Sequence, residues 1–248
     1  MKQFILLPLV CSLFFLSCKK AKPLGLNAQE VINKSIEVSG SQLIDASTIA
    51  FDFRDKHYKA IRNHGDFSLE RHFKDSIFTL RDVVDNNGFN RFVDNEPLEL
   101  LDSMAVKYAA SVNSVHYFSV LPYGLNDEAV IKTFLGEESI KNKNYFKIEV
   151  TFKQDGGGAD YEDVFIYWID KKTFKIDYLA YSFHEKVGLG FRFREVYNER
   201  YINGIRFVDY NNYQPKQKEV NLNELGHLFE NNNLELLSKI ELNNVTVN

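Results

Sequence analysis

Two arginines on one predicted strand are the residues whose type and spacing most directly suggest binding chemistry. Arg192 and Arg194 alternate with two phenylalanines. Because successive strand residues point to opposite faces of a sheet, both guanidinium groups share one face and both phenyl rings lie on the other. Two arginines so placed could bind a phosphate or carboxylate bidentately. They could equally pair with acids on neighbouring strands, such as Asp177 or Glu199, which is the commoner arrangement.

A second candidate binding region is the aromatic stretch from Tyr108 to Leu125. A helix followed by an apolar connector could lie across the open face of a curved sheet and line a cleft for an apolar ligand. The side chains expected to face such a ligand are Tyr108, Tyr117, Phe118, Leu121 and Tyr123. The alternative is that these side chains only fill the core.

No residue pattern predicts catalysis, a metal site or a cofactor. The six histidines show none of the paired spacings that zinc sites use, and we interpret them as solvated. The sequence contains no Gly-x-Ser-x-Gly elbow, phosphate loop or dinucleotide fingerprint. The run Gly156-Gly157-Gly158 precedes a predicted strand rather than a helix, which indicates a flexible turn.

The N-terminal residues predict export. Lys2 precedes a mostly apolar run over residues 4–16, which suits a signal peptide but falls short of the ~20 residues that span a bilayer. The run ends in Phe15-Leu16-Ser17-Cys18, which resembles the bacterial lipobox, with Phe15 in place of the usual leucine. The resemblance implies cleavage before Cys18 and lipidation of its sulfur. The alternatives are an ordinary secretory peptide or a buried N-terminal helix.

These features predict the organisation of the chain. Residues 1–17 are interpreted as a signal peptide, 18–26 as a lipidated tether and 27–248 as one domain. Cys18 would be the one cysteine left after cleavage, so the domain has neither a disulfide nor a thiol nucleophile. The tether carries lysines and no acidic residue, which favours the periplasmic face of the outer membrane.

Composition narrows the classes of fold and partner. The formal net charge of -4 argues against nucleic acid as a partner, because such binders need a basic stripe. Aromatic residues make up 14% of the chain, and they favour half-buried strands. We therefore expect a β-rich fold.

Periodicity predicts two groups of strands, each preceded by a helix. Asn27 is placed to cap the first helix and Asn87-Gly88 to form a hairpin turn. The predicted helices cover residues 28–39, 97–112 and, briefly, 222–230. The predicted strands cover residues 49–53, 57–63, 66–73, 76–84, 89–93, 129–135, 144–153, 161–170, 174–183, 189–201, 205–213 and 234–242.

Two hairpin segments carry a resemblance to a known family. Asp170-Lys171-Lys172-Thr173 and Asn203-Gly204-Ile205-Arg206-Phe207 resemble segments that close successive hairpins in the periplasmic lipoprotein-sorting carriers, the Lol-type half-barrels. The resemblance covers most of residues 28–213. It implies an α+β, mainly β fold in which a strongly curved antiparallel sheet has two or three helices over its concave face and can hold acyl chains.

A further stretch, residues 188–195, resembles an uncharacterised family of Bacteroidetes lipoproteins that sometimes carries the label deoxyribose-phosphate aldolase. We expect a non-catalytic envelope lipoprotein that is anchored to a membrane and binds a lipid or other apolar ligand. An aldolase is the disfavoured alternative, since a Schiff-base aldolase needs a barrel of eight strand–helix alternations. An envelope interaction protein without a ligand is the third reading.

Overall fold

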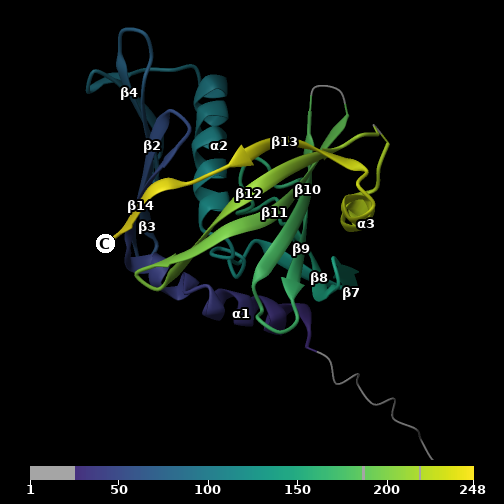
Figure 1. Ribbon diagram of the computed structural model, residues 1–248. Coiled ribbons are helices and arrows are strands. Elements are labelled where there is room, and N and C mark those ends of the chain that lie inside the picture. The colour runs from purple at the N-terminus through teal and green to yellow at the C-terminus, as the bar shows by residue number, and fades with distance from the viewer. Residues whose placement is uncertain (1–25, 186–187, 218) are drawn as a thin grey trace, which may run out of the picture.

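The computed structural model describes residues 26–185, 188–217 and 219–248. The predicted signal peptide and Cys18 lie outside these residues. Within them the chain forms two seven-stranded antiparallel sheets, three α-helices and two short 3-10 helices (Figure 1). Every sheet neighbour is antiparallel, so this part of the chain does not form the parallel-stranded barrel that a Schiff-base aldolase uses.

The first sheet has the order β14-β1-β2-β3-β4-β5-β6 and the second the order β13-β12-β11-β10-β9-β8-β7. The strands of the first sheet are β1 (Thr48–Phe53), β2 (Lys56–Asn63), β3 (Asp66–Lys74), β4 (Thr79–Asp85), β5 (Gly88–Val93), β6 (Glu96–Leu98) and β14 (Asn243–Val247). Those of the second are β7 (Val130–Ile140), β8 (Lys143–Phe152), β9 (Val164–Asp170), β10 (Ile176–His184), β11 (Leu189–Ile202), β12 (Ile205–Pro215) and β13 (Leu234–Ile240). The helices are α1 (Ala28–Val38), η1 (Ser41–Ala46), α2 (Asp102–Ser119), η2 (Leu222–Glu224) and α3 (Leu225–Glu230).

Local sequence explains the hairpins and the first helix. Asn203 and Gly204 both adopt positive φ, which a two-residue turn between twisted strands requires. Asn27 accepts a hydrogen bond from the Glu30 amide while the Glu30 carboxylate accepts one from the Asn27 amide, so the predicted cap of α1 is confirmed.

The mainly β, antiparallel fold with few helices is confirmed, but its hydrogen bonding divides the expected single sheet into two. The C-terminal segment joins them: β13 pairs with β12 at the edge of the second sheet, and β14 pairs with β1 at the edge of the first. Only Glu241 and Leu242 separate β13 from β14. Figure 1 shows this yellow segment passing from one sheet to the other. The predicted closing strand therefore ends before Leu242, and the last strand was not predicted.

The second sheet is buried on both faces. One face, which includes Tyr167 and Leu179, packs against α1 and the C-terminal end of α2. The opposite face, which includes Trp168 and Phe193, packs against Phe229 of α3. Two helices therefore cover the face turned toward the first sheet, while the third covers the other side.

The second helix starts later and ends later than the sequence predicts. Pro97 does not begin it but lies in β6, at the edge of the first sheet, where the missing N–H of proline costs no ladder hydrogen bond. The helix runs over Asp102–Ser119 instead of 97–112, so part of the expected connector is helical. Within the described residues, none of the helices combines the length and the apolar character needed to cross a membrane.

Candidate ligand-binding cleft

The C-terminal half of α2 lies between the two sheets and is bordered by cavities. Three of those in the described part of the chain share residues of this helix, so they form neighbouring compartments of one cleft. The first cavity has a volume of about 230 Å³, the second about 430 Å³ and the third about 490 Å³. The first and second meet at Ser114, Phe118 and Arg194.

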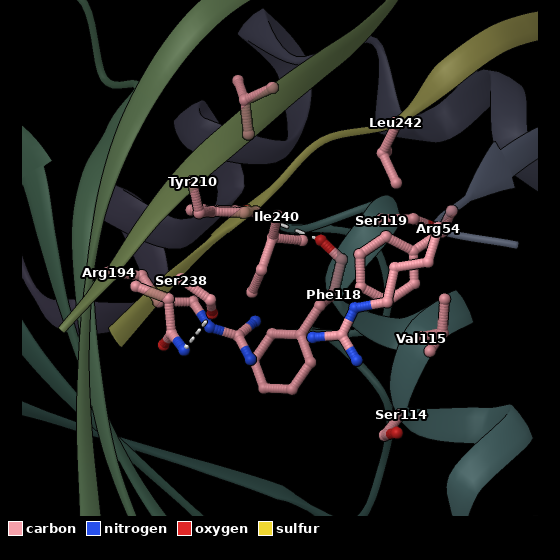
Figure 2. Close-up of a pocket in the computed structure, with 13 residues that line it drawn as sticks. Arg54, Ser114, Val115, Phe118, Ser119, Arg194, Tyr210, Ser238, Ile240 and Leu242 are labelled. Carbon is pink, nitrogen blue, oxygen red and sulfur yellow. Dashed lines mark hydrogen bonds between the residues drawn. The ribbon is translucent and has the colours of Figure 1, made fainter. Parts of the chain in front are cut away.

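The first cavity lies where β1, α2 and strands β11 to β13 approach one another. Its apolar wall includes Val115, Val208, Ile240 and Leu242. Arg54 enters from the end of β1 and Arg194 from β11, and no carboxylate belongs to the lining. Figure 2 shows both guanidinium groups turned toward the Phe118 ring.

The second cavity is aromatic on its inner wall and acidic at its rim. The aromatic lining consists of Tyr117, Phe118, Phe152, Phe165, Tyr181 and Phe183. The loop between β8 and β9 adds Asp160, Glu162 and Asp163. Burial raises the pKa of Asp163 to about 6, and the neighbouring carboxylates act in the same direction. The cleft thus carries positive charge in one compartment and negative charge at the rim of the next.

Phe118 and Arg194 form the wall between these two cavities. The Arg194 guanidinium carbon lies 3.7 Å from the centroid of the Phe118 ring, and Nη2 donates a 2.8 Å hydrogen bond to the Tyr181 hydroxyl. The side chain is buried, yet Nε and Nη1 have no acceptor within hydrogen-bond distance among the described residues. The cross-strand neighbour Asn212 likewise leaves Oδ1 without a donor.

The other residues of the predicted aromatic stretch are dispersed. Tyr117 lines the second and third cavities, and its hydroxyl lies 3.1 Å from that of Tyr167, where burial raises the pKa of both phenols. Tyr123 lines only the third. Leu121 is a core residue outside the three cavities. Tyr108 stacks on Phe89 of the first sheet and also lies outside them. The structure therefore brings Tyr117 and Phe118 together at the cleft but not Leu121 or Tyr108.

The two predicted arginines also have different surroundings. Arg192 lies against Phe183 and 3.8 Å from Glu185, and it is not part of the lining of the three cavities. The expected pairing of these arginines with Asp177 or Glu199 is wrong, because other cations occupy both acids. Asp177 pairs with a lysine of β8, and Glu199 pairs with an arginine of β12 and the lysine before β10.

The third cavity contains two buried polar residues, Arg62, which the sequence did not indicate, and His116. The interpretation of the six histidines as solvated is wrong for His116, which is 1% exposed. Arg62 of β2 has an Nη1 without an acceptor among the described residues and faces the Tyr123 ring. His116 of α2 donates Nε2–H to the Glu70 carbonyl at 3.0 Å, and burial lowers its pKa to about 4. Arg54 and Asn212 of the first cavity were also missed. No local signal marks Arg54, Arg62 and Asn212, since strands far apart in sequence bring them to α2. No group of histidine, cysteine and carboxylate side chains suited to a metal ion occurs in the described residues.

The arrangement can hold an elongated apolar molecule against aromatic rings and offer hydrogen-bond donors at one end. A family model described as "Family of unknown function (DUF6503)" matches residues 1–242. No match was found among curated proteins. The structure is similar to that of a DUF1329 family protein from Desulfovibrio piger, with a TM-score of 0.54 and 11% identity, over 89% of this chain and 92% of the other. It is also similar to a LolA superfamily protein from Nitrosomonas europaea, with a TM-score of 0.47 and 13% identity, over 90% of this chain and 92% of the other. The similarity to the DUF1329 family protein is one of fold, and at 11% identity it extends no further.

Proposed function

Because this chain belongs to the DUF6503 family of unknown function, we propose a function from its own geometry: it is a membrane-anchored lipoprotein of the cell envelope that binds a lipid or another apolar ligand beside α2. In this proposal Cys18 carries the anchoring lipid, and residues 18–26 tether the domain to the periplasmic face of the outer membrane. The anchor rests on the lipobox resemblance. The binding rests on one observation, the adjoining cavities with aromatic walls between the two sheets.

The physical case for an apolar ligand comes from the walls of the cleft. Rings from α2, β9 and β10 face the second cavity, and aliphatic side chains of β12 and β13 face the first. Each methylene group of a ligand that leaves water for such surroundings contributes about 0.8 kcal/mol. An acyl chain gains this energy along its whole length, whereas a small polar metabolite does not.

A cavity-filling substitution tests the proposal. Ser114 is half-buried and lines both the first and the second cavity, so Ser114→Trp places an indole where the ligand is expected. Val106→Trp is the matched control, because Val106 lies on the same helix, is 58% exposed and belongs to none of the three linings.

The measurement is the non-covalent lipid that the full chain carries. Each variant is extracted from membranes in mild detergent, and solvent-extractable acyl lipid is quantified by mass spectrometry. We expect bound lipid in the wild type and in Val106→Trp, and a loss of several-fold in Ser114→Trp. Circular dichroism checks that all three are folded. A folded wild type that carries no more lipid than Ser114→Trp would contradict the proposal.

A further inference from the structure

Arg194 is a buried cation without an anionic partner. Its side chain is 7% exposed, and the described residues contain no carboxylate in ion-pair contact with it. One of its donors reaches the Tyr181 hydroxyl, while Nε and Nη1 have no acceptor within hydrogen-bond distance. Taking a charge out of water without a partner costs several kcal/mol, so such an arrangement is rare unless the charge serves a purpose.

The aromatic rings around Arg194 compensate part of this cost but give Nε and Nη1 no hydrogen-bond acceptor. Phe118 lies against the guanidinium at 3.7 Å, with Tyr181 and Tyr210 at 5.1 and 5.7 Å. A stacked guanidinium keeps its N–H groups in the plane of the fork, where they match the two oxygens of a carboxylate or phosphate. Nε and Nη1 point to different sides of the guanidinium, so these two unused donors can each take one oxygen acceptor of an anion.

The surroundings on the first-cavity side also favour a negatively charged group. Arg54 is a second cation of this lining, and Ser238 and Asn212 add polar atoms. Of the first two cavities, only the second has carboxylates in its lining, at the rim formed by Asp160, Glu162 and Asp163. The two ends of the cleft therefore differ in charge, and an anion is attracted to the first cavity and repelled from the rim of the second.

Resting on the proposed function, we infer that the ligand is an acidic amphiphile: its carboxylate or phosphate binds Arg194 and Arg54 in the first cavity, and its acyl chain passes Phe118 into the second. The ring of Phe118 then contacts the guanidinium on one side and the first methylene groups of the ligand on another. The aromatic wall beyond it, with Phe165 and Tyr181, contacts the rest of the chain.

The test compares a fatty acid with its uncharged ester. Full-length protein in phosphatidylcholine vesicles is exposed to a photoreactive fatty acid carrying a diazirine or to the methyl ester of the same acid, and labelling of the cleft is measured against concentration. A hydrogen-bonded anion at Arg194 predicts half-maximal labelling at a roughly 10- to 100-fold lower concentration for the acid. Arg194→Gln is expected to abolish this preference and keep ester labelling unchanged.

Arg192→Gln is the matched control, since Arg192 lies two residues away on the same strand face but outside the cavities, and it should retain the preference. Equal labelling by acid and ester in the wild type, or a preference that survives Arg194→Gln, overturns the inference and leaves the apolar cleft intact. Loss of acid labelling on addition of inorganic phosphate at about 10 mM assigns the site to a free anion and likewise overturns the inference. If neither probe labels the wild type above Ser114→Trp, the proposed function itself fails.

Discussion

Replacing Asp82 by asparagine is expected to lower the free energy of unfolding by about 3–5 kcal/mol. Asp82 of β4 is fully buried and holds two arginines of the neighbouring strands. Its Oδ2 accepts from Arg71 Nη2 at 2.6 Å and Nε at 3.0 Å, and from Arg91 Nη2 at 2.9 Å. Its Oδ1 accepts from Arg91 Nε at 2.6 Å.

The size of this expected loss of stability follows from the buried charges that asparagine leaves without a partner. The substitution keeps the shape but removes the one negative charge between two arginines whose side chains are 8% and 9% exposed. It also turns an NH₂ group toward donors. Breaking a buried pair by removing one partner has a large cost because the other charge stays buried and uncompensated. For a domain of this size the loss corresponds to a fall in Tm of about 6–20 °C.

The same cluster also holds α2, the helix that borders the cleft, against the first sheet. Arg71 Nη1 donates to the Ser111 hydroxyl at 2.8 Å, and the Arg91 guanidinium lies 3.7 Å from the centroid of the Tyr108 ring. Asp82→Asn is therefore also expected to reduce lipid binding, although Asp82 touches none of the three cavities.

The assay is thermal and urea unfolding of the full chain, followed by circular dichroism. Glu96→Gln is the control, because it neutralises an exposed carboxylate in the same sheet and should shift stability by less than about 0.5 kcal/mol. A loss below about 1 kcal/mol for Asp82→Asn would refute the reasoning, since it would mean that water or other groups satisfy both arginines.

Two further predictions concern pH and a close backbone approach. Burial lowers the pKa of His116 from its ordinary 6.5 to about 4, so between these values the unfolded chain binds a proton that the native state does not, and stability should fall by about 3 kcal/mol as pH drops through this window. His116→Gln should weaken this dependence of the free energy of unfolding on pH, as measured by urea titrations at several pH values. An unchanged dependence would show that other groups cause it. Gly40→Ala should destabilise by about 1–3 kcal/mol more than Gly65→Ala, because both glycines have positive φ but a Cβ at Gly40 meets the Gly204 carbonyl whereas one at Gly65 meets open space. Equal Tm values for the two variants would contradict this packing.

Local sequence was sufficient for the hairpins and the first helix. Alternating strands, the Asn-Gly turns and the Asn27 cap depend on interactions within a few residues, and the structure places them close to where the pattern predicts. The second helix was misplaced because Pro97 suits a first helical position and an edge strand equally well. The sequence alone could not show that residues 96–98 pair with β5 and form the edge of the sheet.

Residue patterns predict a β-rich antiparallel domain that follows a lipobox-like cysteine, with Arg192 and Arg194 on one strand face. The packed fold buries Arg194 without an acid, leaves Arg192 outside the cavities and brings Arg54 to the same cavity from the other sheet. Strand periodicity fixes the face on which a side chain lies, but the charges around that side chain come from strands and helices that are distant in sequence.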